Sequence, residues 1–137
     1  MQAHPQSPPA LEIDLTSAPA RADLAKLSLR LFDLWQLDTA TQLQLLGLSP
    51  TSRALLTRYR NGAAVPNNRD GLDRIGLLLS IHKALRLLYP HNDRLCYEWV
   101  KLRHSAFGQR TALEVMVDEG LIGLAKVARY LDWQRGR

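Results

Sequence analysis

The sequence predicts an all-α protein in which two helical halves share one long central helix. Apolar residues recur at three- and four-residue spacing in several segments, which is the pattern of amphipathic helices. Helix-capping residues and glycines bound those segments, and no run of residues convincingly indicates paired β-strands. The chain of 137 residues suffices for one compact domain or two small helical units with a common core. We divide it into a tail (1–20), a first half (21–90) and a second half (91–137).

The tail is expected to be extended or disordered, because residues 1–19 contain four of the seven prolines. Leu11, Ile13 and Leu15 alternate with acidic residues, a pattern compatible with contact to a partner or with a short strand. The tail lacks the basic start and apolar run of a secretory signal. The longest apolar stretch, residues 76–81, is too short for a membrane span, and the single cysteine has no partner in the chain. We therefore expect a cytoplasmic protein.

The first half is predicted to hold four helices. The first begins near Ala22, and the second covers 39–46 with Asp38 or Thr39 as its N-cap, Thr39 and Gln42 having the form of a capping box. A third helix is predicted from Ser49-Pro50 to Arg60, because a serine cap followed by proline suits a helix start. Two helices joined by a short turn with glycine indicate a helix-turn-helix. The fourth helix, 72–89, is strongly apolar and is expected to be the central one.

The second half is predicted to hold three shorter helices. The fifth runs from an Asp93 cap to about residue 102, and the sixth from a Thr111/Glu114 capping box to Glu119. Gly120 is expected to end the sixth helix, and a last helix covers 122–134.

Positive charge is concentrated in the middle of the chain. The net charge is +5, but residues 51–110 hold eleven basic against four acidic residues, whereas residues 1–50 hold three against five. Such a block favours a polyanion-binding surface, the alternative being an ordinary solvated basic face. Hydroxyls and guanidiniums on the third helix are side chains that contact phosphates and base edges. We predict DNA binding by Ser49, Thr51, Ser52, Arg53, Thr57 and Arg58.

The sequence carries no pattern typical of an enzyme, a metal site or a cofactor site. The four histidines are scattered, and His91 with Cys96 has no recognised metal-ligand spacing. Asp118 and Glu119 are adjacent in a predicted helix, where successive side chains do not face each other. We predict a non-enzymatic protein without cofactor or metal.

Aromatic residues are dense near the C-terminus. Trp99 and Phe107 are predicted to be core residues. Trp133 lies close to the chain end between polar residues, and near-terminal aromatic and arginine residues are good interface anchors. The alternative is that Trp133 fastens the last helix to the fourth.

Several motifs together resemble one known family. The first group comprises residues 46–49 (LGLS), 59–62 (YRNG) and the apolar helix 74–89, and is common among helix-turn-helix proteins. The second, more distinctive group comprises Trp99-Val100, residues 106–109 (AFGQ), 111–116 (TALEVM), Gly120 and 127–131 (VARYL). From about Ala22 onward the chain resembles the Xre/MbcA/ParS antitoxins.

The resemblance implies an Xre-like helix-turn-helix bundle followed by a small toxin-binding domain. It also implies an antitoxin that neutralises a RES-domain, NAD-degrading toxin by covering its active site, forms a homodimer and represses its own operon by binding operator DNA. The toxin-binding residues we predict are Arg129, Tyr130, Trp133, Arg135 and Arg137. We further hypothesise that the basic peptide 133–137 reaches into the cofactor cleft of the toxin. A helical interaction module or transcription regulator without a toxin partner is the alternative.

Overall fold

The computed structural model describes residues 14–136 and confirms the all-α fold class. These residues form six α-helices: α1 (Ala18–Leu34), α2 (Thr39–Leu46), α3 (Arg53–Arg60), α4 (Arg69–Leu88), α5 (Asp93–Glu98) and α6 (Ala112–Arg135). Two 3₁₀ turns, η1 (Trp99–Lys101) and η2 (Ser105–Phe107), and two short strands, β1 (Arg103–His104) and β2 (Arg110–Thr111), lie between α5 and α6. Leu11 and Ile13 of the proposed alternating segment lie outside the described residues, and Leu15 is exposed.

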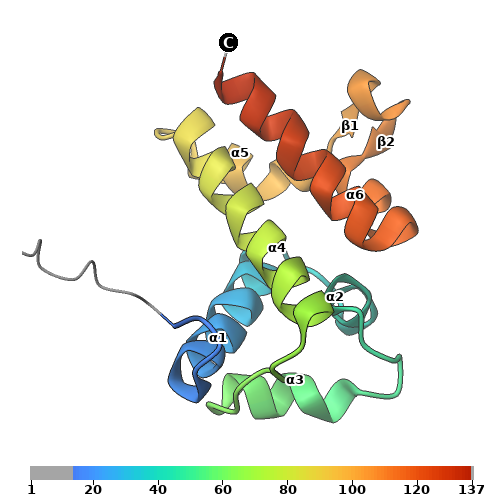
Figure 1. Ribbon diagram of the computed structural model, residues 1–137. Coiled ribbons are helices and arrows are strands. Elements are labelled where there is room, and N and C mark those ends of the chain that lie inside the picture. Colours follow the sequence, from blue (N-terminus) through green and yellow to red (C-terminus); the bar gives the residue numbers. More distant parts are fainter. Residues whose placement is uncertain (1–13, 137) are drawn as a thin grey trace, which may run out of the picture.

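The long helix α4 is the centre of the molecule (Figure 1). Helices α1, α2 and α3 surround one end of it, and α5 and α6 lie beside the other. The most extensive contact between two helices is that of α4 with α6, and α6 also contacts α2. The buried apolar side chains form one cluster that runs through both ends. The shared central helix predicted from the sequence is therefore present, and the two halves have a common core.

The start of α1 differs from the prediction. The helix begins at Ala18, before the predicted Ala22, because Ser17 caps it by accepting a hydrogen bond from the backbone N–H of Ala20 (3.3 Å). Pro19 occupies the first turn, where its missing N–H is not needed. The proline that suggested a tail is thus part of the helix start.

Helix α2 is capped by Asp38. The Asp38 carboxylate accepts from the N–H of Thr41 (2.7 Å), which decides between the two predicted caps. The Gln42 amide instead donates to the carbonyl of Leu37 (2.9 Å), so the suggested Thr39/Gln42 capping box is wrong. Gly47 ends the helix with a left-handed backbone (φ 70°), as predicted.

The predicted start of the third helix is wrong. Residues 49–52 form a turn, in which the N–H of Ser52 donates to the carbonyl of Ser49 (2.9 Å), and α3 begins only at Arg53. The Ser49 hydroxyl bonds to the hydroxyl of Thr51 (2.9 Å) and does not cap a helix. Serine side chains that bond locally in this way stabilise turns in competition with helix.

Other helix boundaries also shift by a few residues. Helix α4 begins at Arg69, ahead of the predicted Leu72, because the Asn68 amide accepts from the N–H of Gly71 (2.7 Å). Asn92, and not Asp93, caps α5 through the N–H of Leu95 (3.1 Å). The predicted fifth helix ends early, at Glu98, where the chain continues as the 3₁₀ turn η1.

The strands β1 and β2 were not expected. They pair in antiparallel register, Arg103 opposite Thr111 and His104 opposite Arg110. Each strand has two residues, too few for alternation to be visible in the sequence.

Helix α6 is bent at Gly120, where the sequence predicted a helix end. Its N-terminus carries the predicted capping box: the Thr111 hydroxyl accepts from the N–H of Glu114 (3.0 Å), and the Glu114 carboxylate accepts from the N–H of Thr111 (3.3 Å). At Gly120 the backbone adopts φ 61° and ψ −136°, a conformation open essentially to glycine. At Gly123 a Cβ atom would lie 2.2 Å from the carbonyl oxygen of Val115. The two glycines allow the second segment of α6 to turn back closely over the first.

Across residues 14–136, no helix combines the length and apolar character required to cross a membrane.

Candidate functional site

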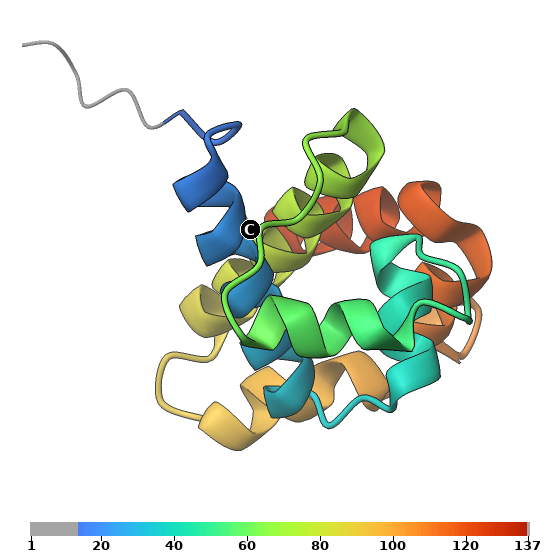
Figure 2. The same cartoon turned by 90° about the horizontal axis from the view of Figure 1, so that it is seen from below.

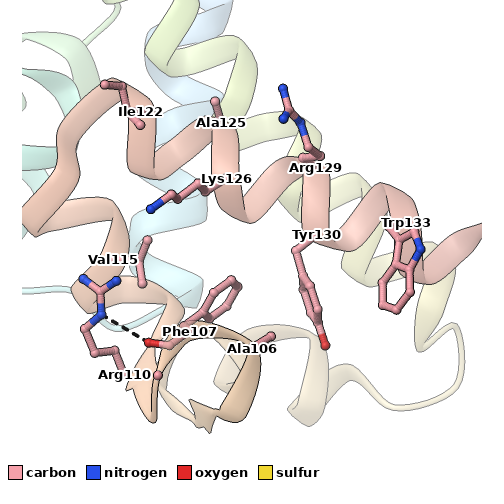
Figure 3. A pocket seen from close by; sticks show the side chains of 11 residues that line it. Ala106, Phe107, Arg110, Val115, Ile122, Ala125, Lys126, Arg129, Tyr130 and Trp133 are labelled. Atoms are coloured by element: carbon pink, nitrogen blue, oxygen red, sulfur yellow. Dashed lines mark hydrogen bonds between the residues drawn. The ribbon is translucent and has the colours of Figure 1, made fainter.

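An open groove of about 900 Å³ lies between the second segment of α6 and the β1–β2 hairpin (Figure 3). The hairpin contributes one wall, with Phe107 at its base, and α6 contributes the other. Two large apolar side chains at this site are exposed, Ile122 (69%) and Trp133 (56%). Exposed apolar side chains of this size, gathered at a hollow, are typical of a surface that another molecule covers.

The hairpin holds its shape through two consecutive residues in left-handed conformation. Gly108 has φ 66° and Gln109 also has φ 66°, and the Gln109 N–H donates to the carbonyl of His104 (3.0 Å). The Arg110 guanidinium closes the turn by donating to the carbonyl of Phe107 (3.2 Å), as Figure 3 shows. A non-glycine residue at positive φ is uncommon, and such residues concentrate at functional sites.

Aromatic rings fix the groove wall to the core. Phe107 packs edge-on against Tyr130, with ring centres 5.2 Å apart, and Trp99 stacks on Tyr130 at 6.3 Å. Tyr130 in turn contacts Trp133 at 6.2 Å. Trp99 and Phe107 are buried, as predicted, whereas Trp133 extends the cluster to the surface. The exposed indole is therefore presented from a rigid support, as interface anchors are.

Basic side chains lie around the apolar residues that line the groove. Lys126 (2.6 Å) and Arg110 (2.9 Å) both bond the Glu119 carboxylate and lower the pKa of that group, the Lys126 hydrogen bond having the larger effect. This arrangement, named here the Glu119 clamp, ties the hairpin to both segments of α6. Arg129 lines the same groove and has no ion-pair or hydrogen-bond partner among residues 14–136. One cation at the groove thus remains available to an acidic partner group.

Comparison with known proteins places the groove inside a named domain. Residues 84–137 match the model of the antitoxin Xre/MbcA/ParS C-terminal toxin-binding domain. The chain is also 33% identical to the uncharacterized protein y4oB of Sinorhizobium fredii over 107 residues, which cover 78% of this chain and 80% of that protein. The chain belongs to the Xre/MbcA/ParS antitoxin family. All groove residues fall within the matched segment, and the antitoxin therefore has a toxin as partner and a regulatory role.

Three of the five predicted toxin-binding residues of this antitoxin line the groove: Arg129, Tyr130 and Trp133. Arg135 lies further along α6, where it pairs with Asp132 (3.1 Å). Arg137 lies outside the described residues. Of the two predictions for Trp133, its exposure of 56% favours the interface anchor over an internal fastening.

Sequence reasoning missed the other wall of the groove. It predicts Phe107 only as a core residue, and it assigns no role to Ile122, Lys126 and Arg110. A signal for Ile122 was present: it follows closely after the break at Gly120, so the helical phase that predicts burial is interrupted there. Nothing local indicates that Arg110 would meet Glu119, because that contact depends on the bend of α6.

The predicted DNA-binding residues lie at the other end of the antitoxin, on and before α3. Figure 1 places α3 at the end of the molecule remote from the β1–β2 hairpin, and in the view of Figure 2 it crosses the near face. Ser52 is half-buried, and the remaining five are exposed: Ser49, Thr51, Arg53, Thr57 and Arg58. The structure thus brings these residues to one surface, although Ser49, Thr51 and Ser52 belong to the turn and not to the helix.

Helices α1 and α3 pack against each other and are also joined by an ion pair. Both terminal nitrogens of Arg60 donate to the Asp33 carboxylate, at 2.7 and 2.8 Å. This bidentate contact lowers the pKa of Asp33. Arg60 is therefore engaged inside the molecule, whereas Arg53 and Arg58 have no partner among the described residues.

Proposed function

We propose that this antitoxin neutralises a RES-domain, NAD-degrading toxin in the cytoplasm by laying its groove over the toxin active site. The observation that carries the proposal is the exposed pair Ile122 and Trp133 beside the unpaired Arg129, inside the segment that matches the toxin-binding domain. An apolar anchor surrounded by a few charges is the usual composition of an interface centre. The basic peptide 133–137 continues the chain from this surface and is proposed to enter the cofactor cleft.

The test is binding to the protein encoded beside this gene and rescue of growth when both are expressed. Trp133→Ala and Ile122→Ala are each expected to weaken the complex by about 30-fold or more, the effect of losing an interface hot spot. Leu87→Ala is the matched control, since Leu87 is a comparably exposed (54%) apolar residue on α4. Equal affinity of wild type and both groove variants would contradict docking through the groove.

A truncation tests the terminal peptide separately. Removal of residues 134–137 keeps every groove side chain, although it takes away the hydrogen bond from the Gln134 amide to the Tyr130 hydroxyl (2.9 Å). The shortened chain is expected to bind the toxin but to inhibit it less. Unchanged inhibition by this chain would refute the cofactor-cleft proposal and leave docking through the groove intact.

We also propose that the α3 surface binds operator DNA, so that a homodimer of the antitoxin represses its own operon. The supporting observation is that Arg53 and Arg58 are exposed and unpaired on one surface with Thr57. A dimer would place two such surfaces on successive major grooves. The alternative, an interaction module whose basic face never meets DNA, predicts no specific binding to the upstream region.

Binding to the upstream DNA at several salt concentrations decides between these two. Arg53→Ala with Arg58→Ala is expected to weaken binding and to reduce the salt slope by about 0.9 for every phosphate that the variant no longer neutralises. Arg94→Ala, an exposed arginine on α5, is the control and should leave both quantities unchanged. Toxin binding by the double variant should also be unchanged, and loss of both activities would indicate misfolding instead.

A further inference from the structure

Arg74 lies at the junction between the first helical half, which contains α2 and α3, and the half that contains α6. It projects from α4, and its side chain is only 16% exposed. Its Nε donates to the Asp70 carboxylate one turn earlier (3.0 Å), which fixes the direction of the guanidinium. The side chain lies close to one glycine of each functional half.

The first glycine is Gly47, at the end of α2 and the start of the turn into α3. A Cβ atom on Gly47 would lie 2.7 Å from the Nε of Arg74 and 3.0 Å from its Cζ. Only a residue without a side chain permits this approach. The guanidinium also lies at the C-terminal end of α2, where the partial negative charge of the helix favours a cation.

The second glycine is Gly120, at the bend of α6. A Cβ atom there would lie 3.7 Å from the Nη2 of Arg74, in ordinary van der Waals contact. The preceding residue is Glu119, whose carboxylate holds Lys126 and Arg110 in the clamp at the groove. The backbone that carries the clamp therefore passes close to the Arg74 guanidinium, with room for little more than one carbon atom between them.

We propose that Arg74 is a positioning residue that couples the groove to the α2–α3 turn. A change at the Glu119 clamp moves the backbone at Gly120, Arg74 follows because its guanidinium is confined, and the turn at Gly47 shifts with it. The biological outcome rests on the proposed function: toxin docking in the groove alters the presentation of α3 to DNA. The coupling itself is a property of the chain alone, and it can be measured without toxin or DNA.

The test uses Glu119→Gln as the perturbation and the backbone amide NMR signals of α3 as the readout, in the full chain. Gln keeps the shape of Glu119 but removes the negative charge and replaces one of the two oxygens that accept from Lys126 and Arg110 with an NH2 group, which cannot accept. In the wild-type background we expect the signals of residues 53–60 to shift. In the Arg74→Met background, which keeps the apolar stem without the guanidinium, we expect those shifts to disappear.

Arg69→Met is the matched control, because Arg69 lies on the same helix, pairs with an acid four residues away (Asp73) and is 95% exposed. Shifts at α3 should persist in that background. If they also persist in Arg74→Met, or if Glu119→Gln leaves α3 unchanged in wild type, the proposal is overturned. Neither result bears on whether Trp133→Ala weakens toxin binding, so the two proposals fail separately.

A second measurement covers the case in which Arg74→Met does not fold. Gly47→Ala is introduced with Arg74 and with Arg74→Lys, which keeps the cation but lacks the planar group. The Gly47→Ala effect on the unfolding equilibrium constant should be about 2- to 150-fold smaller with lysine, the range seen for contacting residues. An equal effect in both backgrounds would show that Arg74 does not constrain the turn.

Discussion

Gly123 of α6 gives the sharpest test of the structure. Replacing a helical glycine with alanine usually raises the free energy of unfolding, whereas at Gly123 the same replacement should lower it. In an exposed helix interior, glycine to alanine stabilises by about 1 kcal/mol. At Gly123 the new Cβ would lie 2.2 Å from the carbonyl oxygen of Val115 and 3.0 Å from the Cβ of Glu119. The first of these atoms is backbone, so the clash can be relieved only by separating the two segments of α6. Overpacking of this kind costs about 1–3 kcal/mol.

The matched control is Gly76→Ala on α4. Gly76 is likewise helical but exposed, and a Cβ there would meet no atom within 4 Å. We therefore expect Gly76→Ala to raise the free energy of unfolding by about 1 kcal/mol and Gly123→Ala to lower it by about 1–3 kcal/mol.

Urea denaturation measures both variants, and an unchanged m-value would show that the comparison concerns stability alone. A Gly123→Ala variant as stable as Gly76→Ala would refute the close return of α6 over itself. Because that return also positions Ile122, the destabilised variant should bind the toxin more weakly, whereas Gly76→Ala should bind it normally.

Two further predictions concern helix caps and acid. Thr111→Ala removes the capping box of α6 and should lower the free energy of unfolding by about 1 kcal/mol. Thr39→Ala removes no cap and should change it by less than about 0.5 kcal/mol. Equal losses of stability in thermal unfolding would contradict the assigned caps. The pKa of Asp33 is lowered by Arg60, so the contribution of this pair is present above the unfolded-state value near pH 4 and disappears as the pH falls further. Asp33→Asn should therefore reduce the loss of unfolding free energy as the pH falls below about 4. Asp23→Asn, on the same helix but outside any described ion pair, should leave that loss unchanged. The same pH dependence in both variants would argue against the Asp33–Arg60 contact.

The helices could be predicted from the sequence because their signals are local. The apolar stripe of α1, the Thr111/Glu114 capping box and the break at Gly120 each depend on residues within one or two turns of each other. Reliance on local signals also explains why the start of α3 is predicted too early. Ser49-Pro50 is a good local helix start, but the Ser49 hydroxyl has an equally local alternative in Thr51.

The groove could be predicted only on one side. Arg129, Tyr130 and Trp133 lie at helical spacing near the chain end, so a single helix brings them together. The other wall depends on the bend at Gly120 and on a hairpin of two-residue strands, neither of which has a periodic signature. Glu119 shows the limit clearly. The sequence around Glu119, including the adjacent Asp118, does not indicate a role for this residue. Its partner Arg110 is brought to it by the tertiary structure.

Because the antitoxin has a single core, its two halves are not independent folding units. The matched toxin-binding segment begins at residue 84, within α4, although Ile75, Leu78 and Ile81 of the same helix are buried in the common core. A fragment cut at that boundary would expose its share of the core to water and lack much of the surface on which α6 lies. The α3 surface and the groove would then be inherited, exchanged and degraded together, since neither can be transplanted without the helix that both require.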